Sequence, residues 1–152
     1  MNKKIFYRII NILCLAIMIG SLVWLIAYWK NIPDEIATHF NLYGEADNFG
    51  SKKDIIVLPI FAWLTYGMMS LVECIPGAWN TGVKVTPENS ARVYSIIKGM
   101  LVTLKLFVVL TFTLITVFSA IGTSIPILFL PVELIGIFGT IIISLIRLYR
   151  AR

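Results

Sequence analysis

The side chains best suited to chemistry lie in one polar segment, residues 31–53, between two long apolar runs. It contains His39, the only histidine of the chain, followed by Asn41 and Asp47. An imidazole near carboxylates could sense pH, bind a ligand or act as one ligand of a weak metal site. Alternatively, His39 and Asn41 could hydrogen-bond the backbone of their own loop. Metal sites usually combine several nitrogen or sulfur ligands at defined spacing, so we expect none here.

The end of the same segment could bind an anion, because Asp47, Gly50, Ser51 and Lys52 stand directly before the second apolar run. Backbone amides at a helix N-terminus bind anions, and Lys52 would suit the phosphate of a lipid headgroup. The alternative is a simple helix cap, with Ser51 three residues before Asp54. The pattern favours the cap.

The middle of the segment is expected to fold rather than to be a flexible connector. Residues 36–40 favour a short extended piece, and Asn41 and Gly44 favour a turn directly after it. The apolar side chains of Ile36 and Phe40 would then hold this loop against the ends of the flanking helices.

Ionisable groups also occur inside the apolar runs. Glu133 is the one charge within residues 127–146, and the rise of a helix puts it about 10 Å deep. At that depth it is either a functional group facing the bundle or water, or a neutral acid that bonds Thr or Ser of the preceding helix. For Lys105 we expect the long stem to reach the headgroups instead of pairing with Glu133. Pro59, inside the second run, is expected to kink its helix.

A second polar motif lies between the second and third apolar runs. Thr86 before Pro87 predicts a helix N-cap, and Glu88 suits the positive end of the helix dipole. The first turns of this helix are amphipathic, so it should begin on the membrane surface and continue into the bilayer. The motif offers a surface for a cytoplasmic protein partner, and its members are Asn80, Thr86, Glu88, Asn89 and Arg92.

The elements that must position these residues are four apolar runs. Of the chain, 59% is apolar and 14% charged, whereas soluble domains are nearer half and a quarter. A helix needs about 20 apolar residues to cross a bilayer, and the charges fall between runs of that length. We therefore predict an all-α integral membrane protein, one membrane domain over residues 1–152. Its parts are helices at about 8–29, 52–75, 87–121 and 127–150, a folded extracytoplasmic loop at 30–51 and a cytoplasmic loop at 76–86.

Orientation follows from the basic residues, which favour the cytoplasmic side. With the N-terminus inside, the cytoplasmic side collects ten of them: Lys3, Lys4, Arg8, Lys84, Arg92, Lys98, Lys105, Arg147, Arg150 and Arg152. The outer side holds three: Lys30, Lys52 and Lys53. Both termini are therefore expected inside, and the net charge of +5 indicates topology, with no nucleic-acid partner. Cys14 and Cys74 would avoid the oxidising side, so we expect no disulfide.

Two stretches together resemble a known family. The first runs from Ile32-Pro33 through Thr38-His39-Phe40-Asn41, Gly44, Asp47 and Gly50-Ser51-Lys52 to Leu58-Pro59. The second contains Asn80, Val83-Lys84, Thr86, Glu88-Asn89, Arg92, Tyr94 and Lys105. In order and spacing they resemble domain of unknown function 1648, the N-terminal membrane module shared with the sporulation-delaying-protein immunity family of bacterial membrane proteins. The resemblance implies a multi-pass protein of the bacterial cytoplasmic membrane.

Two functional hypotheses follow. The first is a non-enzymatic protein of the immunity or sensor kind, whose outer loop engages a peptide or lipid ligand that acts on the envelope. The second is a small oligomeric transporter or lipid-handling protein with Glu133 and Pro59 in its path. Catalysis needs two positioned groups within reach of one substrate, and His39 with Asp47 is the only outer pair, so we expect no enzyme and no cofactor.

Overall fold

The computed structural model describes residues 3–151 and has four α-helices that are long and apolar enough to cross a membrane. They are α1 (Lys3–Tyr28), α2 (Val57–Cys74), α3 (Ser90–Ile121) and α4 (Phe129–Tyr149). Between them lie strands β1 (Glu35–Phe40) and β2 (Ala46–Ser51) and the 3-10 turns η1 (Trp29–Asn31), η2 (Lys52–Ile56) and η3 (Pro76–Ala78). The chain therefore has the predicted architecture of a multi-pass membrane protein. Arg152, one of the basic residues behind the predicted orientation, lies outside the described residues.

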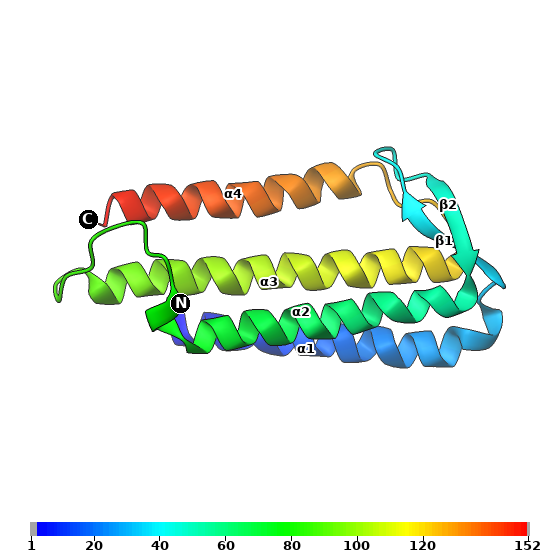
Figure 1. Ribbon diagram of the computed structural model, residues 1–152, viewed down its shortest axis with the longest axis horizontal. Coiled ribbons are helices and arrows are strands. Elements are labelled where there is room, and N and C mark those ends of the chain that lie inside the picture. The colour runs from blue at the N-terminus through cyan, green and yellow to red at the C-terminus, as the bar shows by residue number, and fades with distance from the viewer. Residues whose placement is uncertain (1–2, 152) are drawn as a thin grey trace.

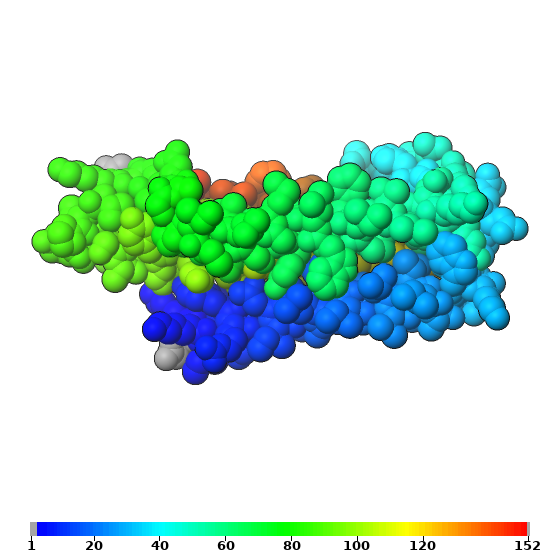
Figure 2. Space-filling model, turned by 60° about the horizontal axis from the view of Figure 1, so that its bottom comes forward, coloured from blue at the N-terminus to red at the C-terminus, as the bar shows by residue number. Residues whose placement is uncertain are grey.

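Helix α3 is the centre of the bundle, with α1 and α2 on one side and α4 on the other (Figure 1). Figure 2 shows α1 and α2 side by side over one face, where they cover much of α3. Helix α4 packs chiefly against α3. At their contact, a Cβ added to Gly136 would collide with the ring of Phe107, so the glycine permits this close approach.

Consecutive helices run in opposite directions, which gives the molecule two distinct ends (Figure 1). The hairpin end carries β1, β2 and residues 122–128, which join α3 to α4. The terminal end carries the first and last described residues and the segment 75–89, which joins α2 to α3. The sequence predicts that the terminal end faces the cytoplasm, and this orientation stays a prediction.

The loop at the hairpin end is an antiparallel β-hairpin, with register Ile36↔Gly50 and Phe40↔Ala46 and a bulge at His39. The predicted extended piece at 36–40 corresponds to β1, whereas β2 was not predicted, so the all-α description omits a small sheet. Residues 46–51 contain Asp, Asn and Gly, which disfavour strands, and it is pairing with β1 that extends them. Below the hairpin, Ile36 and its neighbours are buried against α1 and α3 in a cluster of Leu25, Ile32, Ile36, Ile55 and Ala120.

The structure refines the start of one predicted helix and corrects that of another. The helix predicted at 52–75 consists of η2 followed by α2, which begins at Val57, so Pro59 lies in the first turn of the α-helical part. The expected kink at Pro59 stays a prediction. Helix α3 begins at Ser90 rather than at Pro87, and Thr86 is not its cap. Instead, the Asn89 side chain accepts a hydrogen bond from the Thr86 amide at 2.8 Å, which holds residues 86–89 in a turn before the helix.

Candidate functional site

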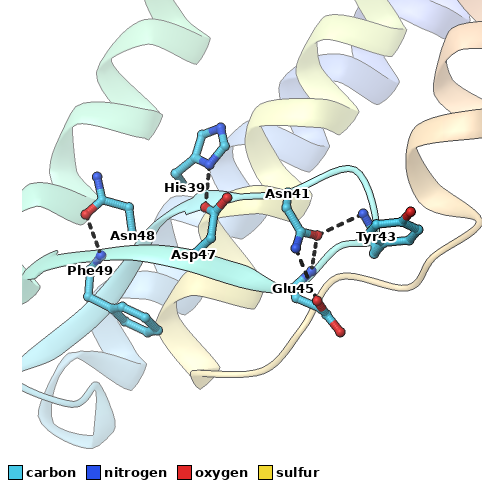
Figure 3. A network of polar contacts seen from close by, with 7 residues as sticks. All are labelled: His39, Asn41, Tyr43, Glu45, Asp47, Asn48 and Phe49. Atoms are coloured by element: carbon cyan, nitrogen blue, oxygen red, sulfur yellow. Dashed lines mark hydrogen bonds and ion pairs between the residues drawn. The ribbon is translucent and has the colours of Figure 1, made fainter.

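Among the polar contacts of the hairpin in Figure 3, two adjacent groups involve predicted site residues. His39 Nδ1 lies 2.5 Å from Asp47 Oδ1, between exposed side chains on opposite strands. Asn41 Oδ1 accepts hydrogen bonds from the amides of Tyr43 at 2.8 Å and Glu45 at 3.1 Å. Asn41 therefore organises the turn through the backbone, while His39 is oriented by a carboxylate.

Gly44 fixes the tip of the hairpin to the connection between α3 and α4. Its φ is +82°, a left-handed conformation that favours glycine. Its carbonyl accepts a hydrogen bond from the Ile125 amide at 2.8 Å, and an added Cβ would collide with the Ile125 carbonyl. This bond attaches the hairpin to a segment that lies far later in the chain, between α3 and α4.

At the end of β2, Ser51 caps the following 3-10 helix and Lys52 bonds the protein itself, which favours the cap over the anion site. Ser51 Oγ accepts a hydrogen bond from the Lys53 amide at 3.4 Å, at the start of η2. Lys52 Nζ donates to the Ile32 carbonyl at 3.1 Å and lies 4.9 Å from the ring centre of Trp29. Lys52 is thus engaged within the protein. The carboxylate of Asp54 lies close to Gly50, and its negative charge would repel a phosphate bound there.

A cavity of about 330 Å³ lies beneath the hairpin and reaches between α3 and α4. Most of its wall is apolar, and polar groups are few. The hairpin contributes Thr38, His39, Phe40, Asn41, Leu42 and Gly44, α2 contributes Leu58, α3 contributes Thr111 and Ile115, and the remainder is Ile125, Pro126, Ile127, Phe129, Leu130 and Glu133. Three predicted site residues of the hairpin, His39, Asn41 and Gly44, therefore meet Glu133 at one cavity.

Glu133 is the one acidic residue in the wall of this cavity, as far as the described residues go. It lies in the second turn of α4 and is 8% exposed. Thr111 Oγ1 on α3 donates to Glu133 Oε1 at 2.5 Å, and the same hydroxyl lies 3.0 Å from the Phe107 carbonyl. Glu133 thus bonds a threonine of the preceding helix, as the packing hypothesis predicts. It also faces a cavity, as the functional hypothesis requires.

Comparison with known families identifies part of this region. Residues 16–62 match DUF1648, a domain of unknown function. The matched segment runs from within α1 through the hairpin and η2 to the first turns of α2. No curated protein and no solved structure matches the chain.

The segment that matches DUF1648 contains the hairpin residues but not Glu133. A second buried site also lies outside it, and this site was not predicted from the sequence. Lys105 on α3 is 1% exposed and forms an ion pair with Glu73 on α2, itself 6% exposed. Lys105 Nζ also donates to Ser70 Oγ at 3.1 Å and lies 4.7 Å from the ring centre of Tyr66. The prediction that Lys105 reaches the headgroups is wrong, because a carboxylate on the neighbouring helix lies within reach and compensates its charge.

One sequence signal could have found this ion pair. Glu73 and Lys105 are single opposite charges at the edges of consecutive apolar runs, and Asn11 is the polar residue of the first run. Asn11 Nδ2 lies 3.5 Å from Glu73 Oε2, so the three helices meet at one polar cluster. Whether these three residues lie at the same depth along the bundle depends on how far α3 extends past the end of α2. The apolar run of one helix does not show this.

The polar motif at the terminal end, beyond the DUF1648 segment, surrounds a separate cleft of about 710 Å³. Four of its five predicted members line that cleft: Thr86, Glu88, Asn89 and Arg92. Asn80 instead accepts a hydrogen bond from the Gly82 amide at 3.1 Å and shapes the loop. A hydrogen bond from the Thr86 side chain lowers the pKa of the Glu88 carboxyl. Most of this motif therefore lies around one cleft, at the opposite end of the molecule from the hairpin.

Proposed function

We propose that the protein is a small membrane receptor of the immunity or sensor kind, which captures an envelope-active molecule beneath its hairpin. The observation that carries this proposal is the cavity shared by His39, Asn41, Gly44 and Glu133. Ligand sites typically have volumes of about 300–1,000 Å³, apolar walls and a few placed polar groups. At about 330 Å³, this cavity suits a small ligand or one side chain of a larger one.

The chemistry of the wall favours a ligand with an apolar body and a cationic or hydrogen-donating group. Glu133 receives a hydrogen bond from the neutral Thr111 hydroxyl, and no cation of the described chain pairs with it. An ionised carboxylate in apolar surroundings is costly unless a charge or a donor compensates it. A cationic group on the ligand would supply that compensation, so cationic amphipathic molecules and peptides fit this site best.

Helix α4 offers a route from this cavity to the terminal end. Glu133 lies near its start, while Leu148 near its end and Ala151 just after it are buried against the beginning of α3. Val83 and Val85 of the segment 75–89 pack on the same cluster. A ligand that displaces α4 would therefore disturb the terminal segment, which is where a cytoplasmic partner would respond. In this proposal the hairpin end is extracytoplasmic in a bacterial cytoplasmic membrane.

The orientation can be tested by labelling single cysteines in intact cells. Cys14 and Cys74 would first be replaced by serine, because both are free thiols and Cys74 is exposed. In that background, a membrane-impermeant maleimide should label His39→Cys without lysis and Ser90→Cys only after lysis. The reverse pattern would reject the proposed side for the ligand.

Function is tested by deleting the gene and challenging cells with cationic membrane-active peptides and small cationic amphiphiles. Deletion should increase sensitivity to at least one compound, and the wild-type gene should restore resistance. Glu133→Gln should fail to restore it, whereas the matched control Glu45→Gln, on the exposed turn, should succeed. Equal sensitivity of the deletion and wild-type strains across the panel would reject the proposal.

A second candidate function is an oligomeric transporter, and one observation favours it. Two buried ionisable sites lie along α3, Thr111 with Glu133 and Lys105 with Glu73, and the helix rise puts Thr111 about 9 Å from Lys105. Buried ionisable groups in membranes often mark ion pathways. Liposome flux that falls in Glu133→Gln would support this function, and flux equal to that of protein-free vesicles would exclude it. Under either candidate we propose no catalytic role.

A further inference from the structure

A third cavity, of about 340 Å³, lies at the terminal end between α1, α3 and α4. It is separate from the Glu133 cavity and from the cleft of the polar motif, with which it shares no residue. Lys3 of α1 and Arg147 of α4 are in its wall, and no acidic residue of the described chain is. Neither cation forms an ion pair with any group between residues 3 and 151. Within residues 3–151, the cavity therefore presents two positive charges that no acidic group pairs with.

Hydroxyl groups line the same cavity, and one of them has no partner. Ser144 on α4 is 8% exposed, and its hydroxyl makes no hydrogen bond to any described residue. In contrast, Thr140 Oγ1 donates to the Gly136 carbonyl at 2.7 Å, and Tyr7 donates to the Ser95 carbonyl at 2.8 Å. Although the residue as a whole is buried, its hydroxyl oxygen is accessible from the cavity, so Ser144 can donate a hydrogen bond to a ligand that brings an acceptor.

From these groups we propose that the cavity binds the phosphate headgroup of an anionic membrane lipid. The Arg147 guanidinium and the Lys3 ammonium would bond the phosphate oxygens, and Ser144 would donate to a phosphate or ester oxygen. Each of these groups is a donor, and an anion with several acceptor oxygens satisfies all of them together.

The surroundings of the cavity favour a lipid over a soluble phosphate. Helix α4 packs chiefly against α3, and the cavity lies between α4 and α1 with an opening to the surface. Ile143, in the cavity wall, and Ile5, on α1, are more than half exposed, as suits residues that face acyl chains. Lys3 and Arg147 lie at the charged ends of two apolar helices, the level at which headgroups lie. A headgroup could thus enter from the bilayer while its chains stay in the hydrocarbon.

The test is native mass spectrometry of the full-length protein, released from detergent with short-chain phosphatidylglycerol or phosphatidylcholine. Phosphatidylglycerol should be retained, and Arg147→Gln should lower its affinity about tenfold or more, as expected for a charge-assisted hydrogen bond. Arg150→Gln is the matched control, because it removes the same charge near the end of the same helix outside the cavity wall, and it should change affinity less than about twofold.

Substitutions at Ser144 test the cavity itself. Ser144→Leu should fill it and abolish retention, while Ser144→Ala keeps the space and removes only the hydroxyl, so it should weaken retention several-fold. Circular dichroism and thermal unfolding in detergent would check that both variants fold, and Arg147→Gln, on an exposed side chain, provides the test if either does not. Equal retention of both lipids, equal losses in Arg147→Gln and Arg150→Gln, or displacement of the lipid by millimolar inorganic phosphate would each overturn the proposal.

Discussion

The two buried acids of this protein differ in what compensates them. Glu73 on α2 forms an ion pair with Lys105 on α3 and receives a further contact from Asn11 on α1, so the protein supplies its partners from two neighbouring helices. Glu133 receives one hydrogen bond, from Thr111, and faces a cavity. A carboxylate that is fully compensated holds helices together, whereas one that is partly compensated remains able to bind a ligand. On this basis we propose that Glu73 acts in stability and that Glu133 acts in binding.

The largest expected effect is that of Lys105→Met, which leaves the Glu73 carboxylate buried without a counter-charge. Breaking a buried pair in this way costs about 3–5 kcal/mol, so the thermal unfolding temperature in detergent should fall sharply. Lys84→Met, which removes an exposed charge at the terminal end, is the control and should change it little. Adding Glu73→Gln to Lys105→Met should recover part of the loss. If the single and double variants were equally destabilised, Glu73 and Lys105 would not be coupled.

Gly44→Ala should have the next largest effect, and this effect should be confined to the hairpin end of the molecule. Alanine is strained at a φ of +82°, and its Cβ would collide with the Ile125 carbonyl. The strain costs about 1–3 kcal/mol before the collision is counted. We expect faster protease cleavage within residues 41–45 and weaker ligand binding. Gly77→Ala, where an added Cβ has open space, should leave both unchanged.

Glu133→Gln addresses the comparison directly, because it keeps the shape of the side chain and removes its charge. Binding of a cationic ligand to the protein in nanodiscs should weaken by about tenfold or more, the loss expected of one buried charge interaction. Unfolding should shift by less than about 1 kcal/mol. Glu73→Gln should show the opposite pattern, with reduced stability and ligand affinity unchanged. Stability losses of similar size in the two variants would remove the distinction between the acids.

The smallest effect concerns Glu88, an exposed residue of the terminal end. The Thr86 hydroxyl lowers its pKa, so Thr86→Val should raise that pKa toward the ordinary value of glutamate. A lowered pKa in the folded state stabilises the protein above the ordinary pKa, and this contribution is lost as the pH falls through the lower folded value. NMR titration of the side-chain carboxyl measures the shift, with Thr81→Val as the control. An unchanged pKa in Thr86→Val would contradict this assignment.

What could be predicted from the sequence depends on how local each feature is. The four helices follow from the length of their apolar runs, and the turn at Asn41 and Gly44 follows from residue type, so both were within reach. Strand β2 contains few strand-forming residues and exists through its pairing with β1. The ion pair of Glu73 and Lys105 depends on the relative heights of two helices. Strand pairing and the relative depth of two helices are set by packing between segments, and they leave no periodic pattern in the sequence of either segment.

The open position of α4 has a practical consequence. Because α3 is the helix against which α4 chiefly packs, much of the circumference of α4 would face acyl chains in a membrane, and its tilt should follow the thickness of the host bilayer. The width of the space beside Glu133 would then vary with the lipids chosen for reconstitution. Affinities measured in thin bilayers, in thick bilayers and in micelles should accordingly differ for the same ligand, and the trend with acyl-chain length becomes a measure of how freely α4 pivots.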